Sequence, residues 1–232
     1  MLSSPPATTP LSISEHANPA DILLRGGFGP RVRRLHARIG HAHHQAEGMA
    51  FSRALLEGRA TPRQLAALLR ALPPAYALME EEGPHLAAAL GAASLPWTDR
   101  ARSTALRHDQ AILAVLPPTP PSLAALLWLE RLKELAWQAP HRFMAHVYVR
   151  YGGDLSGGQR LAEEANAILR RHDLPAVTFW AFAKAIPALK VAFHDGFERM
   201  LLTDQEEREL LDEAELAFRA TQKLLAELES ID

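Results

Sequence analysis

Cysteine is absent from this sequence of 232 residues. Its absence excludes structural disulfides, thiolate catalysis, zinc sites with thiolate ligands and iron–sulfur clusters, and it fits a reducing compartment. The sequence also lacks an excess of either charge, because its formal net charge is −2. Proteins that bind phosphate backbones usually carry a basic excess. We therefore expect no nucleic-acid partner.

Long hydrophobic runs are also missing, and no stretch is apolar enough to span a bilayer. The first residues lack the basic start and apolar run of a signal peptide, and the C-terminus carries no hydrophobic anchor. These absences predict a soluble, cytoplasmic protein without a membrane partner. Pro, Ser and Thr dominate the beginning of the chain, so residues 1–28 are predicted to form a flexible arm ahead of one domain at 29–232.

Helical periodicity dominates the remainder of the sequence, which has no convincing alternation of period two, no hairpin dipeptides and no repeat. Two capping boxes, TPRQ from Thr61 and TDQE from Thr203, mark helix starts. The predicted fold class is therefore all-α. Helices are expected at about 30–46, 50–56, 62–79 with a kink or break at Pro73-Pro74, 97–115, 122–135, 141–152, 155–171, 187–201 and from 204 onward.

The segment YVRYGGDLSGGQ at 148–159 holds four glycines within seven residues. Each glycine inside a helix costs about 0.5–1 kcal/mol relative to alanine, so a reason is expected. Gly153 and Gly157 share one helix face, and a flat ligand laid against bare backbone is one explanation. A helix end followed by a loop and a new helix is another. LSGGQ at 155–159 also matches ATP-binding-cassette proteins, but the phosphate loop and strands of that family are missing.

Histidines gather on the first predicted helix, and a neutral imidazole is a suitable axial ligand for haem iron. His43 lies near the apolar stripe of this helix. Glu47 follows it by four residues, the spacing for side-chain contact, and a carboxylate can orient the second imidazole nitrogen. From spacing alone, a set of surface histidines is the alternative. The other histidines on this helix are His36, His41 and His44.

Taken together, the two segments resemble the haem oxygenase family. HHQAE at 43–47 is similar to the proximal-helix pattern H-x-Q-A-E, and AHVYVRYGGDLSGGQ at 145–159 to the distal-helix pattern A-H-x-Y-x-R-Y-x-G-D-L-S-G-G-Q. Weaker similarity at YALMEEE, 76–82, extends the resemblance over about 31–229. It implies a single-domain helical fold with haem between a proximal and a distal helix. It also implies oxidative cleavage of haem to biliverdin, carbon monoxide and ferrous iron.

The resemblance implies roles for the matching residues. His43 would ligate the iron, and Glu47 would orient the His43 imidazole. Gly153 and Gly157 would let the distal helix close over the haem and O2, and Asp154 would hold a distal water network. Further site residues implied in the same way are Tyr76, Tyr148 and Arg150 around that network or the haem edge, Gly158 in the glycine stretch, Phe218 beside the pocket, and Lys190 and His194 as cations for the haem propionates.

Some positions depart from the family pattern. His194 stands where many members have arginine, His36 where some have lysine, and Val149 where animal members have a hydroxyl residue. Because propionate anchoring sets the rotation of the haem, the site of ring opening does not follow from the sequence.

The implied cofactors are b-type haem, which is also the substrate, and O2. Nothing resembles a flavin or nicotinamide site, so the electron donor is expected to be a separate protein: a ferredoxin, a flavodoxin or a reductase. A bilin acceptor is a further candidate partner. The alternatives are a non-catalytic haem carrier or sensor of the same fold, and a similar helical enzyme acting on another small molecule. Asp154 together with Arg150 favours the oxygenase, because a carrier needs neither.

Overall fold

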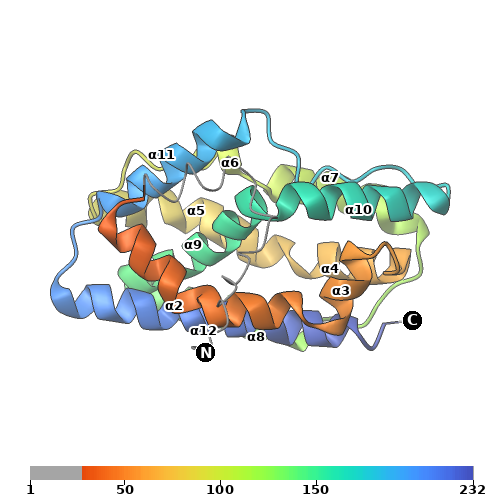
Figure 1. The fold of residues 1–232 in the computed structure, drawn as a ribbon, viewed down its shortest axis with the longest axis horizontal. Helices are drawn as coiled ribbons and strands as arrows, with labels where there is room; N and C mark the ends of the chain where they lie inside the picture. The colour runs from red at the N-terminus through yellow and green to blue at the C-terminus, as the bar shows by residue number, and fades with distance from the viewer. Residues whose placement is uncertain (1–27, 232) are drawn as a thin grey trace, which may run out of the picture.

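The computed structural model describes residues 28–231, and the predicted N-terminal arm therefore lies outside it except for Phe28. The described residues form helices and no strands (Figure 1), which confirms the predicted fold class. The helices are α2 (Pro30–Glu47), α3 (Ala50–Leu56), α4 (Pro62–Ala71), α5 (Pro73–Ala89), α6 (Trp97–Arg100), α7 (Ser103–Ile112), the 3-10 helix η1 (Leu113–Val115), α8 (Leu123–Gln138), α9 (Pro140–Ser156), α10 (Gly158–Arg171), α11 (Ile186–Glu198) and α12 (Asp204–Leu228).

Helix α9 is the central element of the core, since 11 of its 17 residues are buried. The long helix α12 lies along the lower edge of the molecule in Figure 1, and both α9 and α2 pack on it. The other principal neighbours of α9 are α5, α8 and α10. Helix α12 thus holds the two helices that carry the predicted proximal and distal residues.

The predicted helix starts are confirmed at atomic detail. Thr61 accepts a hydrogen bond from the Gln64 backbone N–H, and the Gln64 side chain returns to the Thr61 N–H. Thr203 begins α12 with the same reciprocal arrangement. Each such cap stabilises a helix end by about 0.5–2 kcal/mol. Pro73 separates α4 from α5, as its missing N–H requires.

The predicted helix over 97–115 is instead broken into α6, α7 and η1. The break follows from a tertiary contact, because the Glu80 carboxylate of α5 accepts hydrogen bonds from the backbone N–H groups of Arg102 and Ser103. These are the donors that a continuous helix would use internally. The side chains of Arg100 and Arg102 are buried beside this contact.

The glycine stretch also differs from the prediction. Helix α9 continues through Gly152 and Gly153 and ends at Ser156, and α10 begins at Gly158. Asp154 and Leu155 are buried, so the helix keeps its packing past the first glycine pair. The Gly157 N–H still donates to the Gly153 carbonyl at 2.9 Å. The first helix therefore ends four residues later than expected, and the second begins three residues later.

A buried ionic cluster fixes α9 against α8 and α12. The Glu213 carboxylate receives hydrogen bonds from Arg131 at 2.8 Å, Arg142 at 2.7 Å and His146 Nε2 at 3.0 Å. Trp128 Nε1 donates to His146 Nδ1 at 3.1 Å, so the imidazole proton is on Nε2. Burial disfavours the charged acid, but these donors outweigh it and lower the pKa of Glu213 to about 2.

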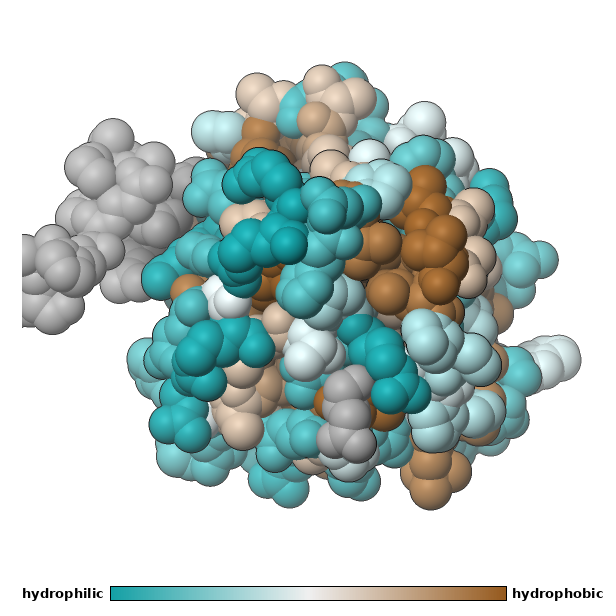
Figure 2. All heavy atoms as spheres, turned by 90° about the vertical axis from the view of Figure 1, so that its right-hand side faces the viewer, coloured by the Kyte–Doolittle hydropathy of each residue, from teal (hydrophilic) through white to brown (hydrophobic). Residues whose placement is uncertain are grey.

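No helix in the range 28–231 is both long and apolar enough to cross a membrane. Figure 2 shows the end of the molecule that lies at the right of Figure 1, where hydrophilic residues cover most of the surface and the largest apolar patch lies right of centre.

Candidate functional site

The predicted proximal residues lie on the surface of α2 near its C-terminus. His43 Nδ1 is 3.6 Å from a Glu47 carboxylate oxygen, and the His43 side chain is 52% exposed. The His43 ring centroid lies 5.7 Å from that of Phe218 on α12. The structure therefore brings these three predicted residues together, with the imidazole held between a carboxylate and an aromatic ring.

Gly153 of α9 and Gly157, the residue that follows its last turn, form an exposed face beside a helix that is otherwise largely buried. A Cβ added to Gly153 would meet no atom within 4 Å, and one at Gly157 would meet only the Gly153 carbonyl at 3.8 Å. Both positions thus border open space. Bare backbone of this kind fits a flat ring laid against the helix.

Behind this face, a buried network joins Asp154, Tyr76 and Arg150. The Tyr76 hydroxyl donates to Asp154 Oδ2 at 2.6 Å, and Arg150 Nη2 donates to the Tyr76 oxygen at 3.2 Å. The spacing of the sequence predicts contact between Arg150 and Asp154 along one helix face, whereas the structure links them through Tyr76 of α5. Burial raises the pKa of Asp154, although the positive charge of Arg150 acts to lower it. Burial also raises the pKa of Tyr76.

Sequence reasoning missed a second polar group that adjoins this network. The Tyr151 hydroxyl donates to Glu80 Oε1 at 3.0 Å. The Arg100 guanidinium is fully buried and lies 3.9 Å from the centroid of the Trp97 ring and 4.2 Å from that of Tyr151. Burial lowers the pKa of Arg100 to about 10. In the sequence, the only sign of this group is that Glu80 follows Tyr76 by four residues within YALMEEE, which places both on one helix face. The other members of the group come from α6 and α9, far away in the sequence.

The predicted cation residues lie at the junction of α2, α9 and α11. The Tyr148 ring centroid is 6.4 Å from that of His194 and 6.1 Å from that of His36. Phe28 stacks on His36 at 5.0 Å, and Lys190 is buried on α11. Among the described residues, the buried Tyr148 hydroxyl and His194 Nδ1 have no hydrogen-bond partner, which fits an acidic ligand group.

The half-buried position of His194 on α11 affects its protonation. Burial lowers its pKa to about 4, and the neighbouring charges of His36 and Lys190 act in the same direction. The side chain is therefore neutral at pH 7 in this structure.

Gly158 lies away from the exposed glycine face. A Cβ at this position would come within 2.8 Å of the Trp180 ring, and the Gln159 side chain donates to the Trp180 carbonyl at 2.9 Å. The missing side chain at Gly158 is therefore explained by the packing of the connection between α10 and α11.

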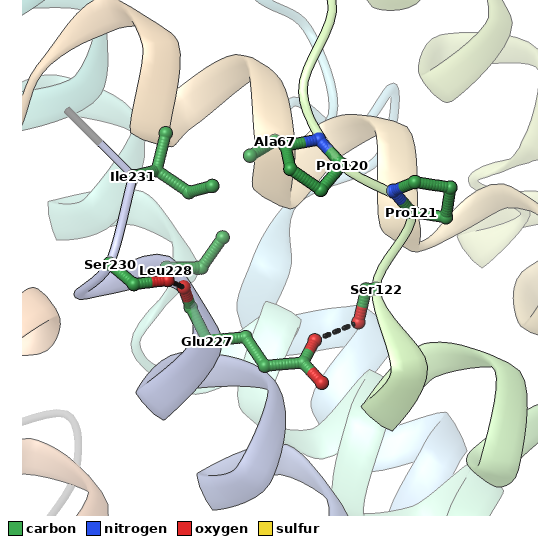
Figure 3. Close-up of a pocket in the computed structure, with 8 residues that line it drawn as sticks. All are labelled: Ala67, Pro120, Pro121, Ser122, Glu227, Leu228, Ser230 and Ile231. Atoms are coloured by element: carbon green, nitrogen blue, oxygen red, sulfur yellow. Dashed lines mark hydrogen bonds between the residues drawn. The ribbon is translucent and has the colours of Figure 1, made fainter.

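A separate pocket at the C-terminal end of α12 contains none of the predicted site residues (Figure 3). Its volume of about 150 Å³ is below the roughly 300–1,000 Å³ of most ligand pockets. It is therefore a poor candidate for a large planar ligand. Its lining residues are Ala67, Pro120, Pro121, Ser122, Glu227, Leu228, Ser230 and Ile231.

Comparison with known proteins agrees with this geometry. Residues 32–227 match the protein family described as "Heme oxygenase". The heme oxygenase of Guillardia theta is 32% identical over 111 residues, which are 47% of each chain. The structure of heme oxygenase from Leptospira interrogans has a TM-score of 0.77 and 27% identity, and covers 86% of this chain and 100% of that chain. The structure of heme oxygenase-1 from Synechocystis sp., in complex with heme, has a TM-score of 0.77 and 25% identity, and covers 87% of this chain and 93% of that chain.

This chain therefore belongs to the haem oxygenase family. The resemblance seen in two short segments is confirmed over most of the chain, and with it the helical fold. The predicted enzyme class, degradation of haem to biliverdin, carbon monoxide and iron, is confirmed as well. The family binds haem and requires a reductant.

Proposed function

We propose that this chain cleaves haem with His43 as the proximal iron ligand and with Asp154, Tyr76 and Arg150 as its distal polar network. The observation that carries the proposal is the exposed Gly153–Gly157 backbone directly beside this buried network. Haem, when bound, supplies both the iron that activates O2 and the ring that is oxidised.

On the proximal side, His43 Nδ1–H would donate a hydrogen bond to the Glu47 carboxylate, which would leave Nε2 for the iron. In the haem-free chain Nδ1 lies 3.6 Å from the carboxylate oxygen, which is longer than a hydrogen bond, so a small side-chain rotation would be needed to form it. Such partners fix the tautomer of ligating histidines. Phe218 packs against the imidazole ring and limits its rotation.

On the distal side, Gly153 and Gly157 keep the helix backbone clear so that the ring lies close to it. A side chain at either position would occupy that space. A ring held against this backbone would also leave less space for O2. The two glycines thus leave room for the haem ring next to Asp154.

Asp154 holds the proton that the reaction needs at the O2 site. Its Oδ2 accepts from Tyr76, which leaves Oδ1 to order a water molecule. Arg150 fixes the other side of the Tyr76 hydroxyl, so the carboxylate has one orientation. The raised pKa of Asp154 makes proton uptake easier than for an exposed aspartate.

The propionate groups would be held at the junction of α2, α9 and α11. Lys190 supplies a charge there, while the Tyr148 hydroxyl and His194 Nδ1 supply buried polar atoms without partners in the described chain. His194 would contribute a hydrogen bond through its buried Nδ1.

Electrons would come from a separate donor, such as a ferredoxin, a flavodoxin or a reductase, and a bilin acceptor would take the product. We place the reaction in the cytoplasm, in line with the cysteine-free sequence.

The proposal is tested by mixing purified protein with hemin and then adding a reductant in air. We expect a ferric haem complex whose Soret band disappears as biliverdin forms. A haem complex that survives the reductant would favour a carrier or sensor, which needs His43 and the glycine face but not the distal network.

A further inference from the structure

Helix α2 carries histidines that the haem proposal leaves unused, and one of them, His44, lies beside Glu47. Its Nδ1 lies 3.6 Å from one Glu47 carboxylate oxygen, and His43 Nδ1 lies 3.6 Å from the other. We propose that His43, His44 and Glu47 form a site for a divalent transition-metal ion, and that its natural occupant is the ferrous iron that haem cleavage releases beside His43. The identity of the occupant rests on the proposed function, whereas the site itself rests on geometry.

The geometry of the three side chains suits one ion. Ligand atoms held about 2.1 Å from a metal, at angles of about 90–109°, lie roughly 3.0–3.4 Å apart. The two nitrogen–oxygen separations are only slightly longer, and all three ligand atoms lie within 4.8 Å of one another. The side chains of His43, His44 and Glu47 are 52%, 84% and 55% exposed, so small rotations can close the site.

Neither imidazole is already hydrogen-bonded to the carboxylate, because 3.6 Å exceeds the usual 2.7–3.2 Å of such bonds. The Glu47 carboxylate thus lies near both imidazoles, because Glu47 follows His43 by four residues and His44 by three. Water would complete the coordination, since the group is exposed.

The ligand set indicates the class of metal. Two histidines and one carboxylate with open positions are the donor set typical of non-haem ferrous iron, and imidazole also suits cobalt, nickel and zinc. Magnesium and calcium prefer oxygen ligands and larger ligand numbers. The site should therefore discriminate against them.

Haem binding and this site exclude each other. With haem, His43 uses Nε2 for the iron and keeps a proton on Nδ1 for Glu47, whereas the metal site needs His43 Nδ1 deprotonated and facing the metal. The site becomes available only when haem has left His43. This order of events places it where it receives the iron after ring cleavage.

The binding test uses haem-free protein titrated anaerobically with Co²⁺, which has visible absorption, and separately with Fe²⁺. We expect one ion bound per chain, at least tenfold weaker binding by His44→Ala, and no Co²⁺ at this site in the haem-loaded protein. His41→Ala is the matched control, because His41 lies on the same helix but pairs with Gln45 at 3.0 Å. Equal Co²⁺ affinity in the wild type and His44→Ala would overturn the site, whatever the protein does with haem.

The second test follows iron after a single turnover with a colorimetric ferrous chelator in the solution. His44→Ala should form biliverdin at the wild-type rate but deliver iron to the chelator several-fold faster, and His41→Ala should match the wild type in both. Identical iron release by all three proteins would overturn the assignment to product iron. Failure of haem cleavage in all three would overturn the proposed function and this assignment, and the Co²⁺ titration would still decide the site.

Discussion

Asp154→Ala is the substitution that best separates a catalytic from a structural role for the distal network. It removes the acceptor of the buried Tyr76 hydroxyl, which keeps only its hydrogen bond from Arg150. Leaving a buried donor unsatisfied costs about 1–3 kcal/mol. In a chain of this size each kcal/mol corresponds to a decrease in Tm of about 2–4 °C, so we expect a decrease of about 2–12 °C.

This loss of stability is too small to explain a large loss of activity. If the wild type is stable by about 5 kcal/mol, the low end for native proteins, a loss of 3 kcal/mol still leaves more than about nine-tenths of the molecules folded. Removal of a proton-transfer group typically costs about 10²–10⁴ in rate. We therefore expect at least about 100-fold slower biliverdin formation, with haem binding retained because His43 is intact.

The assay combines thermal unfolding, haem titration and biliverdin yield per folded molecule. Asp154→Asn is the matched variant: its amide oxygen still accepts from Tyr76, so it should lose less stability and retain more activity than alanine. Full yield from a destabilised Asp154→Ala protein would refute the catalytic role and leave Asp154 as a packing residue.

The pKa of Asp154 adds a pH dependence to this comparison. Burial raises that pKa in the folded chain, so the wild type loses stability as pH rises from the unfolded pKa of about 4 to the folded value. The alanine variant has no such loss. The stability difference between the two proteins should therefore be largest in acid and shrink as pH rises, and denaturant unfolding at several pH values measures it. A difference that grows with pH would contradict this account of the buried carboxylate.

The remaining predictions concern the proximal ligand, the glycines and the buried ionic cluster. His43→Ala should abolish normal turnover and alter the ferric haem spectrum, with added imidazole partly restoring it, while His41→Ala should behave as the wild type; the reverse result would reject the ligand assignment. Gly153→Ala should stabilise the helix by about 0.5–1 kcal/mol yet weaken haem binding, whereas Gly158→Ala should destabilise the chain through its close contact; equal thermal shifts would contradict the two placements. Glu213→Gln should cost about 1–3 kcal/mol at pH 7, because the buried carboxylate loses its charge while Arg131 and Arg142 remain about one-third exposed. Since the folded pKa of Glu213 is lowered to about 2, that stability difference should fade as pH drops from about 4.5 to 2, and denaturant unfolding across this range checks it.

Local signals account for most of the helices that the sequence predicts. Capping boxes at Thr61 and Thr203 and the proline at Pro73 act within a few residues, so they mark the same boundaries in the structure. The prediction of one helix over 97–115 was wrong because the Glu80 carboxylate, about twenty residues earlier in the chain, accepts a hydrogen bond from the backbone N–H of Arg102. Such a contact leaves no periodic signal in the sequence.

The candidate site divides in the same way. His43 and Glu47 are four residues apart, and their proximity follows from helix geometry. The link between Asp154 and Tyr76 spans 78 residues and depends on how α5 packs on α9, so the sequence supplied the residues through family resemblance but not their contact. Arg100 carried no signal at all, because its aromatic surroundings assemble from three helices.

A haem oxygenase opens the haem ring, whereas a carrier merely holds it. The most direct measurement is the yield of biliverdin and carbon monoxide from a known amount of bound hemin, supplied with excess reductant in air. We expect this chain to form one biliverdin and one carbon monoxide for each haem consumed. A reduced haem complex that stays intact in air, with neither product formed, would contradict this expectation.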